Sequence, residues 1–254
     1  MTAAVRDEDW VLVTGATRGI GRAVAFALAE AGYPLVLWAR TGRELEEIAA
    51  EITAQHGTPV RIASVDVSVA AEVDKAVADS LAGIATLRGA VINAGGGIWS
   101  SIEEMAVEDW RTVVGTNLDG AFHTLRVAMP LLRGHRGAQL VGLASDSSYG
   151  SFPQRGAYCA SKAGFRSLLE TARRELRESG VRVTVLVPSR VDTYFRGKQP
   201  GDRPEALSRT EVAEVVATLF AMEPRVEVRE VQLSSIHSSF GPFPEVAPEE
   251  LTDV

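Results

Sequence analysis

The chain has 254 residues, 46% hydrophobic and 23% charged, a balance typical of a globular protein with one large core. Its net charge of −7, without a basic run, argues against nucleic-acid binding. A single cysteine, Cys159, allows no intramolecular disulfide, and no secretory signal or membrane span is predicted, so we expect a cytoplasmic protein with no membrane partner. Four scattered histidines lack the spacing of metal ligands, so no metal site is predicted.

Short apolar segments alternate with helix-length segments along the chain. Strands are predicted at residues 10–14, 34–39, 60–65, 89–93, 138–144, 181–187 and 228–233. Helices are predicted at 19–31, 42–55, 70–81, a pair within 107–133, 158–179 and 210–221. Most strand segments lack polar alternation, which is typical of strands covered on both faces. We therefore predict one Rossmann-like α/β domain over 1–254, a doubly wound parallel sheet of about seven strands with helices on both faces.

Two segments interrupt this alternation. Residues 195–204 are polar and rich in Gly and Pro, which predicts a mobile surface loop, here assigned to about 194–208. The end of the chain, from about 235 to 254, carries three prolines and several acids, and is predicted to be an irregular tail.

Three glycines separate the first strand from the first helix. Gly15 suits a tight turn, Gly19 a close approach to a phosphate, and Gly21 close packing of the helix on the strand. The helix N-terminus that follows offers free N–H groups to a pyrophosphate. The spacing Gly-x3-Gly-x-Gly differs from the common Gly-x-Gly-x2-Gly, so a turn with only a packing role is the alternative.

The end of the second strand indicates which dinucleotide would bind. Arg40 stands where an acid would contact a ribose 2′-hydroxyl, and Arg18 lies in the glycine turn. Guanidinium groups suit a 2′-phosphate, so the pair favours NADP over NAD. Either arginine alone could be an ordinary surface charge.

Tyr158 and Lys162 are four residues apart on a predicted helix, and residues at this spacing lie on one face. A phenol has an unperturbed pKa of about 10 and is a poor proton shuttle at neutral pH. An ammonium beside it is expected to lower that pKa. The spacing alone also arises by chance on exposed helices.

The glycine turn, Asn93-Ala94-Gly95 and Tyr158-x3-Lys162 follow the first, fourth and fifth strands in this order. Over residues 10–233 the chain resembles the compact short-chain dehydrogenase/reductase family. The resemblance implies that Ser145 binds the substrate carbonyl, Tyr158 donates a proton, Lys162 holds the nicotinamide ribose and Asn117 anchors a water. Ser145 could instead be a plain strand-end serine, and Asn117 could only satisfy buried backbone groups.

The resemblance also implies a cofactor site for NADP(H). Its expected residues are Gly15, Thr17, Arg18, Gly19, Ile20, Gly21, Arg40, Asp66, Val67, Asn93, Ala94, Gly95, Tyr158, Lys162, Pro188, Val191 and Thr193. Asp66 could alternatively cap a turn. Three positions depart from the family pattern: Ile92 where an asparagine is common, Ser189 in place of the glycine after Pro188, and Arg190 in place of an apolar residue.

A further set of residues is expected to face the substrate, with the 194–208 loop as a lid. They are Trp99, Ser147, Gln154, Arg155, Arg190 and Tyr194. The aromatic members suggest a ketone with an aromatic or cyclic body, and the arginines an anionic group. The arginines could equally pair with nearby acids.

The function predicted from these features is NADPH-dependent reduction of a carbonyl compound, or the reverse oxidation of an alcohol, with a small-molecule substrate. An NAD-dependent alcohol dehydrogenase and a non-catalytic NADP-sensing protein are the alternatives. The family resemblance further implies a homotetramer or homodimer.

Overall fold

The structure, a computed structural model, describes residues 9–194 and 197–238. Seven parallel strands form one sheet in the order β3-β2-β1-β4-β5-β6-β7. The strands are β1 (Val11–Thr14), β2 (Leu35–Ala39), β3 (Val60–Ser64), β4 (Gly89–Ile92), β5 (Gln139–Leu143), β6 (Arg182–Pro188) and β7 (Glu230–Leu233). The order reverses between β1 and β4, so their carboxyl ends flank the crevice where ligands of such sheets bind.

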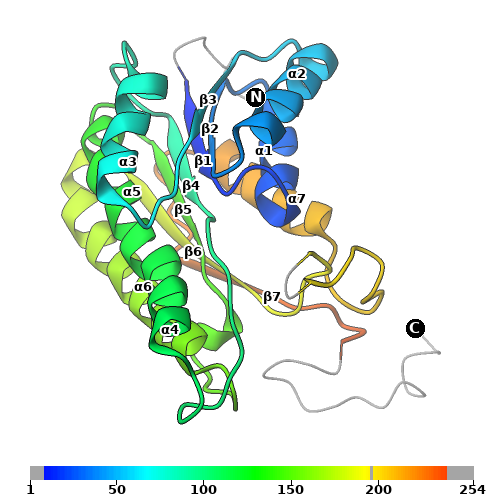
Figure 1. The fold of residues 1–254 in the computed structure, drawn as a ribbon. Coiled ribbons are helices and arrows are strands. Elements are labelled where there is room, and N and C mark those ends of the chain that lie inside the picture. The colour runs from blue at the N-terminus through cyan, green and yellow to red at the C-terminus, as the bar shows by residue number, and fades with distance from the viewer. Residues whose placement is uncertain (1–8, 195–196, 239–254) are drawn as a thin grey trace.

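Helices cover both faces of the sheet (Figure 1). Those of one face are α1 (Gly19–Glu30), α2 (Gly42–His56) and α7 (Arg209–Ala221), and those of the other are α3 (Ala70–Ala76), α4 (Val107–Val114), α5 (Gly120–Arg133) and α6 (Gly156–Leu176). Two π-helical turns, Val77–Leu81 and Gly115–Asp119, extend α3 and join α4 to α5. Short 3-10 turns occupy Asp146–Ser148 and Arg177–Ser179.

The predicted fold is confirmed, with corrections at the ends of elements. Each strand is found within two residues of its predicted bounds, and α6 begins at Gly156, before Tyr158. The helix pair expected within 107–133 is joined through the π-helical turn that contains Asn117. Residues 195 and 196 of the predicted lid and 239–254 of the predicted tail lie outside the described residues.

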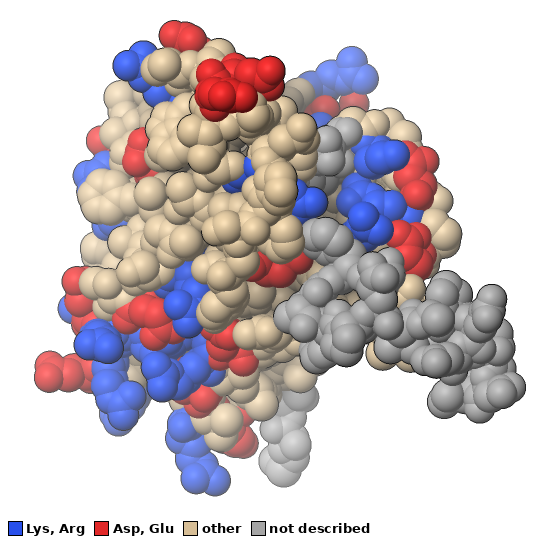
Figure 2. Space-filling model, turned by 90° about the horizontal axis from the view of Figure 1, so that it is seen from below, with Lys and Arg blue, Asp and Glu red and all other residues tan. Residues whose placement is uncertain are grey.

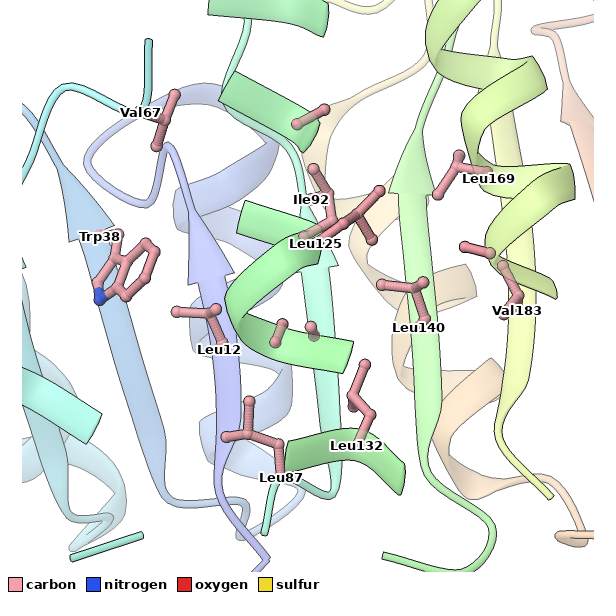
Figure 3. Packing of buried hydrophobic residues seen from close by; sticks show 14 of the residues in the cluster. Leu12, Trp38, Val67, Leu87, Ile92, Leu125, Leu132, Leu140, Leu169 and Val183 are labelled. Atoms are coloured by element: carbon pink, nitrogen blue, oxygen red, sulfur yellow. The ribbon is translucent and has the colours of Figure 1, made fainter. Parts of the chain in front are cut away.

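Two apolar layers hold the helices to the sheet. On the face of α5 and α6, Leu12, Ile92 and Leu140 of the sheet pack against Leu125 and Leu169 of the helices (Figure 3). The five inner strands, β1, β2, β4, β5 and β6, are buried on both faces, which explains why their sequences lack polar alternation. The edge strands β3 and β7 are only partly buried. The pairing register of the strands sets the positions of the loops at their carboxyl ends.

All seven strands point their carboxyl ends to the same side of the molecule. Figure 2 views this side, where uncharged residues cover the centre and charged residues of both signs lie toward the edges. The predicted site residues stand in the loops and helix starts that follow β1, β2, β4, β5 and β6. The fold thus brings segments that are far apart in sequence to one edge of the sheet.

Candidate active site

The glycine turn after β1 has the backbone that its sequence predicts. Gly15 and Gly19 have φ of +67° and +59°, a region that side chains rarely adopt. A Cβ on Gly15 would lie 2.9 Å from Asn93 Nδ2, and one on Gly21 would lie 2.2 Å from the carbonyl oxygen of Gly15. No side chain larger than hydrogen fits at these two positions, so the turn packs directly against the end of β4 and against the first turn of α1.

Thr14, which the sequence analysis did not single out, fastens this turn to the end of β4. Its Oγ1 accepts hydrogen bonds from the backbone N–H groups of Asn93 (3.0 Å) and Ala94 (3.1 Å). The Asn93 side chain donates in return to the carbonyls of Thr14 (3.0 Å) and Gly15 (3.2 Å). The two segments on either side of the crevice are therefore held at a fixed separation.

Two exposed arginines border the crevice. Arg18 is the N-cap residue of α1, and Arg40 directly follows β2, where its carbonyl accepts a hydrogen bond from Ser64 Oγ (2.8 Å). Within residues 9–194 and 197–238, neither guanidinium forms an ion pair with a carboxylate. Together with the N–H groups of the glycine turn and the helix N-terminus, they form a set of donors suited to phosphates.

The loop after β6 closes the other side of the turn. A Cβ on Gly19 would lie 3.8 Å from Thr193 Cγ2, so these two expected cofactor residues face each other. Pro188 ends β6, and Val191 forms an isolated bridge with Leu207. Both side chains are buried. The predicted cofactor residues after β1 and β6 are thus brought together.

Asp66 caps a turn, which was the alternative interpretation of this residue. Its Oδ1 accepts hydrogen bonds from the backbone N–H (2.9 Å) and the hydroxyl (2.7 Å) of Ser68, which caps the turn after β3. Val67 is buried, and its carbonyl accepts from the His123 ring, 2.9 Å away. Asp66 nevertheless lies at the carboxyl edge, beside the second strand.

Tyr158, Ser145 and Lys162 meet where β5 ends and α6 begins. The Tyr158 hydroxyl and Ser145 Oγ are hydrogen-bonded. Lys162 is only 6% exposed, its Nζ donates to the carbonyl of Leu143 (2.7 Å), and it lies 5.9 Å from the centre of the Tyr158 ring. Because the predicted helix forms, the spacing of four residues places tyrosine and lysine on one face.

The titration of this pair differs from the sequence expectation. Burial, opposed by the hydrogen bond with Ser145 and reinforced by the charge of Asp146, raises the pKa of Tyr158 to about 12. Burial also lowers the pKa of Lys162 to about 8. The expected lowering of the tyrosine pKa by Lys162 is therefore not seen in the folded chain, because burial disfavours both the phenolate and the ammonium.

Asn117 is buried in the π-helical turn and is fully engaged. Its Oδ1 accepts from the backbone N–H of Gly96 (2.8 Å), and its Nδ2 donates to the Gly96 carbonyl (2.9 Å) and to Ser161 Oγ (3.0 Å). A Cβ on Gly95 would lie 3.0 Å from Asn117 Oδ1 and 3.7 Å from Lys162 Nζ. Asn117 thus satisfies buried backbone groups, as the alternative interpretation described, and it also lies near the lysine; its role in anchoring a water stays a prediction.

Trp99 covers Tyr158 on the side expected to receive the substrate. The two ring centres are 5.2 Å apart at 45°, and the guanidinium of Arg155 lies 5.5 Å from the Trp99 ring and 4.8 Å from that of Phe152. The backbone N–H of Ser100 donates to the carbonyl of Gln154 (3.0 Å), which ties the loop after β4 to the loop after β5. The Trp99 ring therefore stands beside Tyr158.

The remaining expected substrate residues are placed differently. Ser147 is 2% exposed and its hydroxyl donates to Asp146 (3.4 Å), whereas Gln154 is exposed with a φ of +63°. Arg190 is ion-paired with Glu205 (3.0 Å), as the alternative interpretation described. Tyr194 is exposed, with Arg209 5.9 Å from its ring centre.

Sequence reasoning missed two residues of the turn that follows Ser145. Asp146 is adjacent to Ser145 and accepts a hydrogen bond from its hydroxyl (2.8 Å). Tyr149, three residues further, bonds Glu230 of β7, and Arg166 lies 4.3 Å from its ring centre. Asp146 was visible as a carboxylate beside a candidate catalytic serine, but only the turn at 146–148 shows that it faces the serine hydroxyl.

Comparison with known proteins identifies the family. Residues 9–203 match the short chain dehydrogenase family, and the chain belongs to it. An uncharacterized oxidoreductase of Staphylococcus epidermidis is 32% identical over 233 residues, 90% of this chain and 98% of that protein. An alcohol dehydrogenase from the archaeon Thermococcus sibiricus, solved with 5-hydroxy-NADP, has a TM-score of 0.86 and 34% identity over 91% of this chain and 97% of its own. A metagenomic short-chain oxidoreductase in complex with NADP has a TM-score of 0.78 and 28% identity, covering 89% and 96% of the two chains.

Two features, a membrane-spanning helix and a metal-binding cluster, are absent from the described residues. No helix among them has the length and apolar content needed to cross a membrane. In the same part of the chain, no three His, Cys, Asp or Glu side chains gather in a way that could hold a metal ion.

Proposed function

We propose that this short-chain oxidoreductase is an NADPH-dependent carbonyl reductase that also catalyses the reverse oxidation of a secondary alcohol. The observation that carries the proposal is the hydrogen-bonded pair of Tyr158 and Ser145, with Lys162 beside it, at the sheet edge that also holds the glycine turn. A proton donor thus stands next to a site with the features of a dinucleotide pocket.

The donor set fits NADP(H). Gly15 and Gly21 let the turn pack closely on the end of β4, and the α1 N-terminus would offer N–H groups to the pyrophosphate. Arg18 and Arg40 would bind the 2′-phosphate, since neither is ion-paired within the described residues. The NADP-type ligands of two related structures support the same preference. When bound, the nicotinamide supplies the hydride.

The residues of the chain perform the remaining chemistry. Tyr158 donates its phenolic proton to the developing alkoxide in reduction and accepts it in oxidation. Its raised pKa, about 12, keeps it protonated at neutral pH, the form that reduction requires. Lys162, held by the Leu143 carbonyl, would hold the ribose hydroxyls, and Asn117 keeps the neighbouring backbone of Gly96 in place.

The surroundings of Tyr158 indicate the class of substrate. Trp99 presents an aromatic face beside the phenol, which supports a ketone with an aromatic or cyclic body. Support for an anionic group is weaker, because Arg190 is paired with Glu205 and Arg155 packs against Trp99 and Phe152. The proposed substrate therefore has a cyclic body, and an anionic group is not part of the proposal.

The alternatives differ in cofactor or in turnover. An NAD-dependent enzyme would be expected to have an acid after β2, where Arg40 stands. An NADP sensor would have no use for the hydrogen-bonded Tyr158 and Ser145. Fluorescence titration with NADPH and NADH, followed by a panel of cyclic ketones, separates the three. Tight NADPH binding without turnover on any ketone would favour the sensor.

The variant Tyr158→Phe tests the chemistry. It removes only the hydroxyl, so we expect kcat to fall about a thousandfold while the Kd of NADPH changes little. Tyr33→Phe is the matched control, because Tyr33 packs against Phe220 in the core between α7 and the sheet. Steady-state kinetics of both variants decide the point. Undiminished turnover in Tyr158→Phe would remove Tyr158 from the mechanism.

We also propose that the protein acts in the cytoplasm as a homodimer or homotetramer. Large apolar side chains on α4 and α5, among them Trp110 (43% exposed) and Phe122 (51% exposed), support burial against another copy. Light scattering coupled to size exclusion measures the assembly directly.

A further inference from the structure

The Asp146 carboxylate accepts hydrogen bonds from three serine hydroxyls in the candidate active site. Ser145 Oγ donates to its Oδ1 (2.8 Å), Ser147 Oγ to the same atom (3.4 Å), and Ser189 Oγ to its Oδ2 (3.4 Å). The first contact is short and charge-assisted, and the other two are long. A carboxylate thus joins the candidate catalytic serine to the loop that follows β6.

The contact with Asp146 fixes the polarity of Ser145. A hydroxyl has one proton to donate and two lone pairs that accept. Its proton is directed to Asp146, and its oxygen already accepts from the backbone N–H of Ser147 (3.2 Å). The proton of Ser145 is therefore directed to Asp146, beside the Tyr158 phenol.

The hydrogen bond to Asp146 explains why a serine at position 189 is useful. It stands where the family resemblance implies a glycine after Pro188, and its backbone N–H donates to the carbonyl of Leu233 (2.8 Å). Its side chain turns to Asp146. The hydroxyl that departs from the family pattern is thus used to hold the carboxylate on the side of the β6 loop.

Few charged or titratable groups influence the Tyr158 phenol. Asp146 approaches it from the β5 loop, Arg155 from the start of α6, and Cys159 and Lys162 from α6 itself. The charge of Asp146 raises the pKa of Tyr158 and that of Arg155 lowers it, both less than burial does. Asp146 is the carboxylate of this group, and it contacts the partner of the phenol directly.

We propose that Asp146 is a positioning residue that holds the proton of the Ser145 hydroxyl beside Tyr158 and, through its charge, opposes ionisation of the phenol. A substrate carbonyl then receives its first hydrogen bond from Tyr158. Ser145 can add a second only by turning its proton away from Asp146. Asp146 thus sets the sequence in which the two hydroxyls bind the substrate carbonyl: Tyr158 first and Ser145 second.

The variant Asp146→Asn tests the charge while keeping an acceptor for Ser145. Protein labelled with a fluorinated tyrosine, whose phenol ionises at lower pH, allows ¹⁹F NMR titration where the fold is stable, with Tyr158→Phe assigning the signal. We expect the Tyr158 midpoint to fall by about one pH unit, because a nearby like charge has been removed. The pH profile of alcohol oxidation with NADP⁺ should move to lower pH in parallel.

The control is Glu178→Gln, which removes the same charge from an exposed position after α6 and should leave the midpoint unchanged. An unchanged midpoint in Asp146→Asn overturns the proposal. Loss of kcat at every pH without a shift also overturns it, since that is a merely structural effect. If the amide variant fails to fold, Asp146→Ser replaces it, with the same expected direction. The kinetic arm rests on the proposed function, whereas the NMR arm does not, so their failures are distinguishable.

Discussion

Basic side chains at the two ends of the sheet have opposite surroundings. At the amino end, Arg182 is buried at the start of β6 and donates to backbone carbonyls, among them Leu219 (3.2 Å) and Gly137 (3.4 Å). Arg88, before β4, donates to Gly137 (3.0 Å) and to the carbonyl of Phe220 (3.0 Å). Leu219 and Phe220 lie in the last turn of α7, where carbonyls carry partial negative charge. The positive charge is matched by the fold itself.

At the carboxyl end, by contrast, two arginines have no carboxylate partner within the described residues. Arg18 and Arg40 are exposed and have no ion pair within the described part of the chain. Lys162 is buried there, with the Leu143 carbonyl as its acceptor. The same residue types therefore serve stability at one end and are available to a ligand at the other. Burial does not distinguish a stabilising cation from one that is available to a ligand, since both Arg182 and Lys162 are buried. The number of carbonyl oxygens that accept from the cation does distinguish them.

The largest effect is expected when the hydrogen bonds of Arg182 at the amino end are removed. Arg182→Met leaves several carbonyls near the end of α7 without their donor, which we expect to lower the free energy of unfolding by about 3 kcal/mol. For a chain of this size the melting temperature should fall by roughly 6–12 °C. Thermal melts measure it, and kcat per folded molecule should not change.

The control for this prediction is Arg225→Met, since Arg225 is exposed just beyond α7. It should leave the melting temperature within about one degree. If both variants melt like the unmodified chain, the carbonyl contacts of Arg182 contribute no net stability, and the contrast between the two ends would lose its meaning.

A smaller effect is expected at the carboxyl end. Arg40→Ser and Arg18→Ser should each raise the Kd of NADPH about tenfold, since each removes a charged donor to the 2′-phosphate. The Kd of NADH and the melting temperature should stay the same. Fluorescence titration with both cofactors provides the measurement. Arg43→Ser, at an exposed arginine of α2 that pairs with Glu47, is the matched control. Equal losses for both cofactors would contradict a role in binding the phosphate.

The sequence was enough to predict the fold because its signals are local. Apolar runs such as that around Val91 mark strands, and the spacing between Tyr158 and Lys162 places them on one helix face. Order along the chain then predicted one edge for the glycine turn and the tyrosine. These inferences need only periodicity and the rule that parallel strands share a carboxyl edge.

Contacts between side chains of different loops could not be predicted in this way. Arg190 was a candidate for binding an anionic substrate group, and the structure shows it paired with Glu205, fifteen residues further along the chain. The pKa of Tyr158 depends on how deeply the fold buries it, which spacing does not reveal. Asp146 is adjacent to Ser145 in sequence, but only a 3-10 turn aims it at the serine.

The last effect, similar in free energy to the tenfold change in Kd but opposite in sign, concerns Lys162, the buried cation with a single backbone acceptor. Burial lowers its pKa to about 8 from an ordinary 10.5, so holding the ammonium below pH 8 costs about 3 kcal/mol of stability. Lys162→Met removes that cost but leaves the Leu143 carbonyl without its donor. We therefore expect a net gain of roughly 1–2 kcal/mol at pH 7, with loss of activity.

The pH dependence gives this prediction its sign. The folded lysine releases its proton at about pH 8, whereas the unfolded one keeps it to about 10.5, so the unmodified protein gains stability between these values. The difference in melting temperature between Lys162→Met and the unmodified chain should therefore shrink from pH 7 to pH 9.5. Lys75→Met, at an exposed lysine paired with Asp79, should show no such trend. A variant that is less stable by the same amount at both pH values would mean that the Leu143 hydrogen bond outweighs the cost of burial, and that Lys162 is matched by the fold as fully as Arg182.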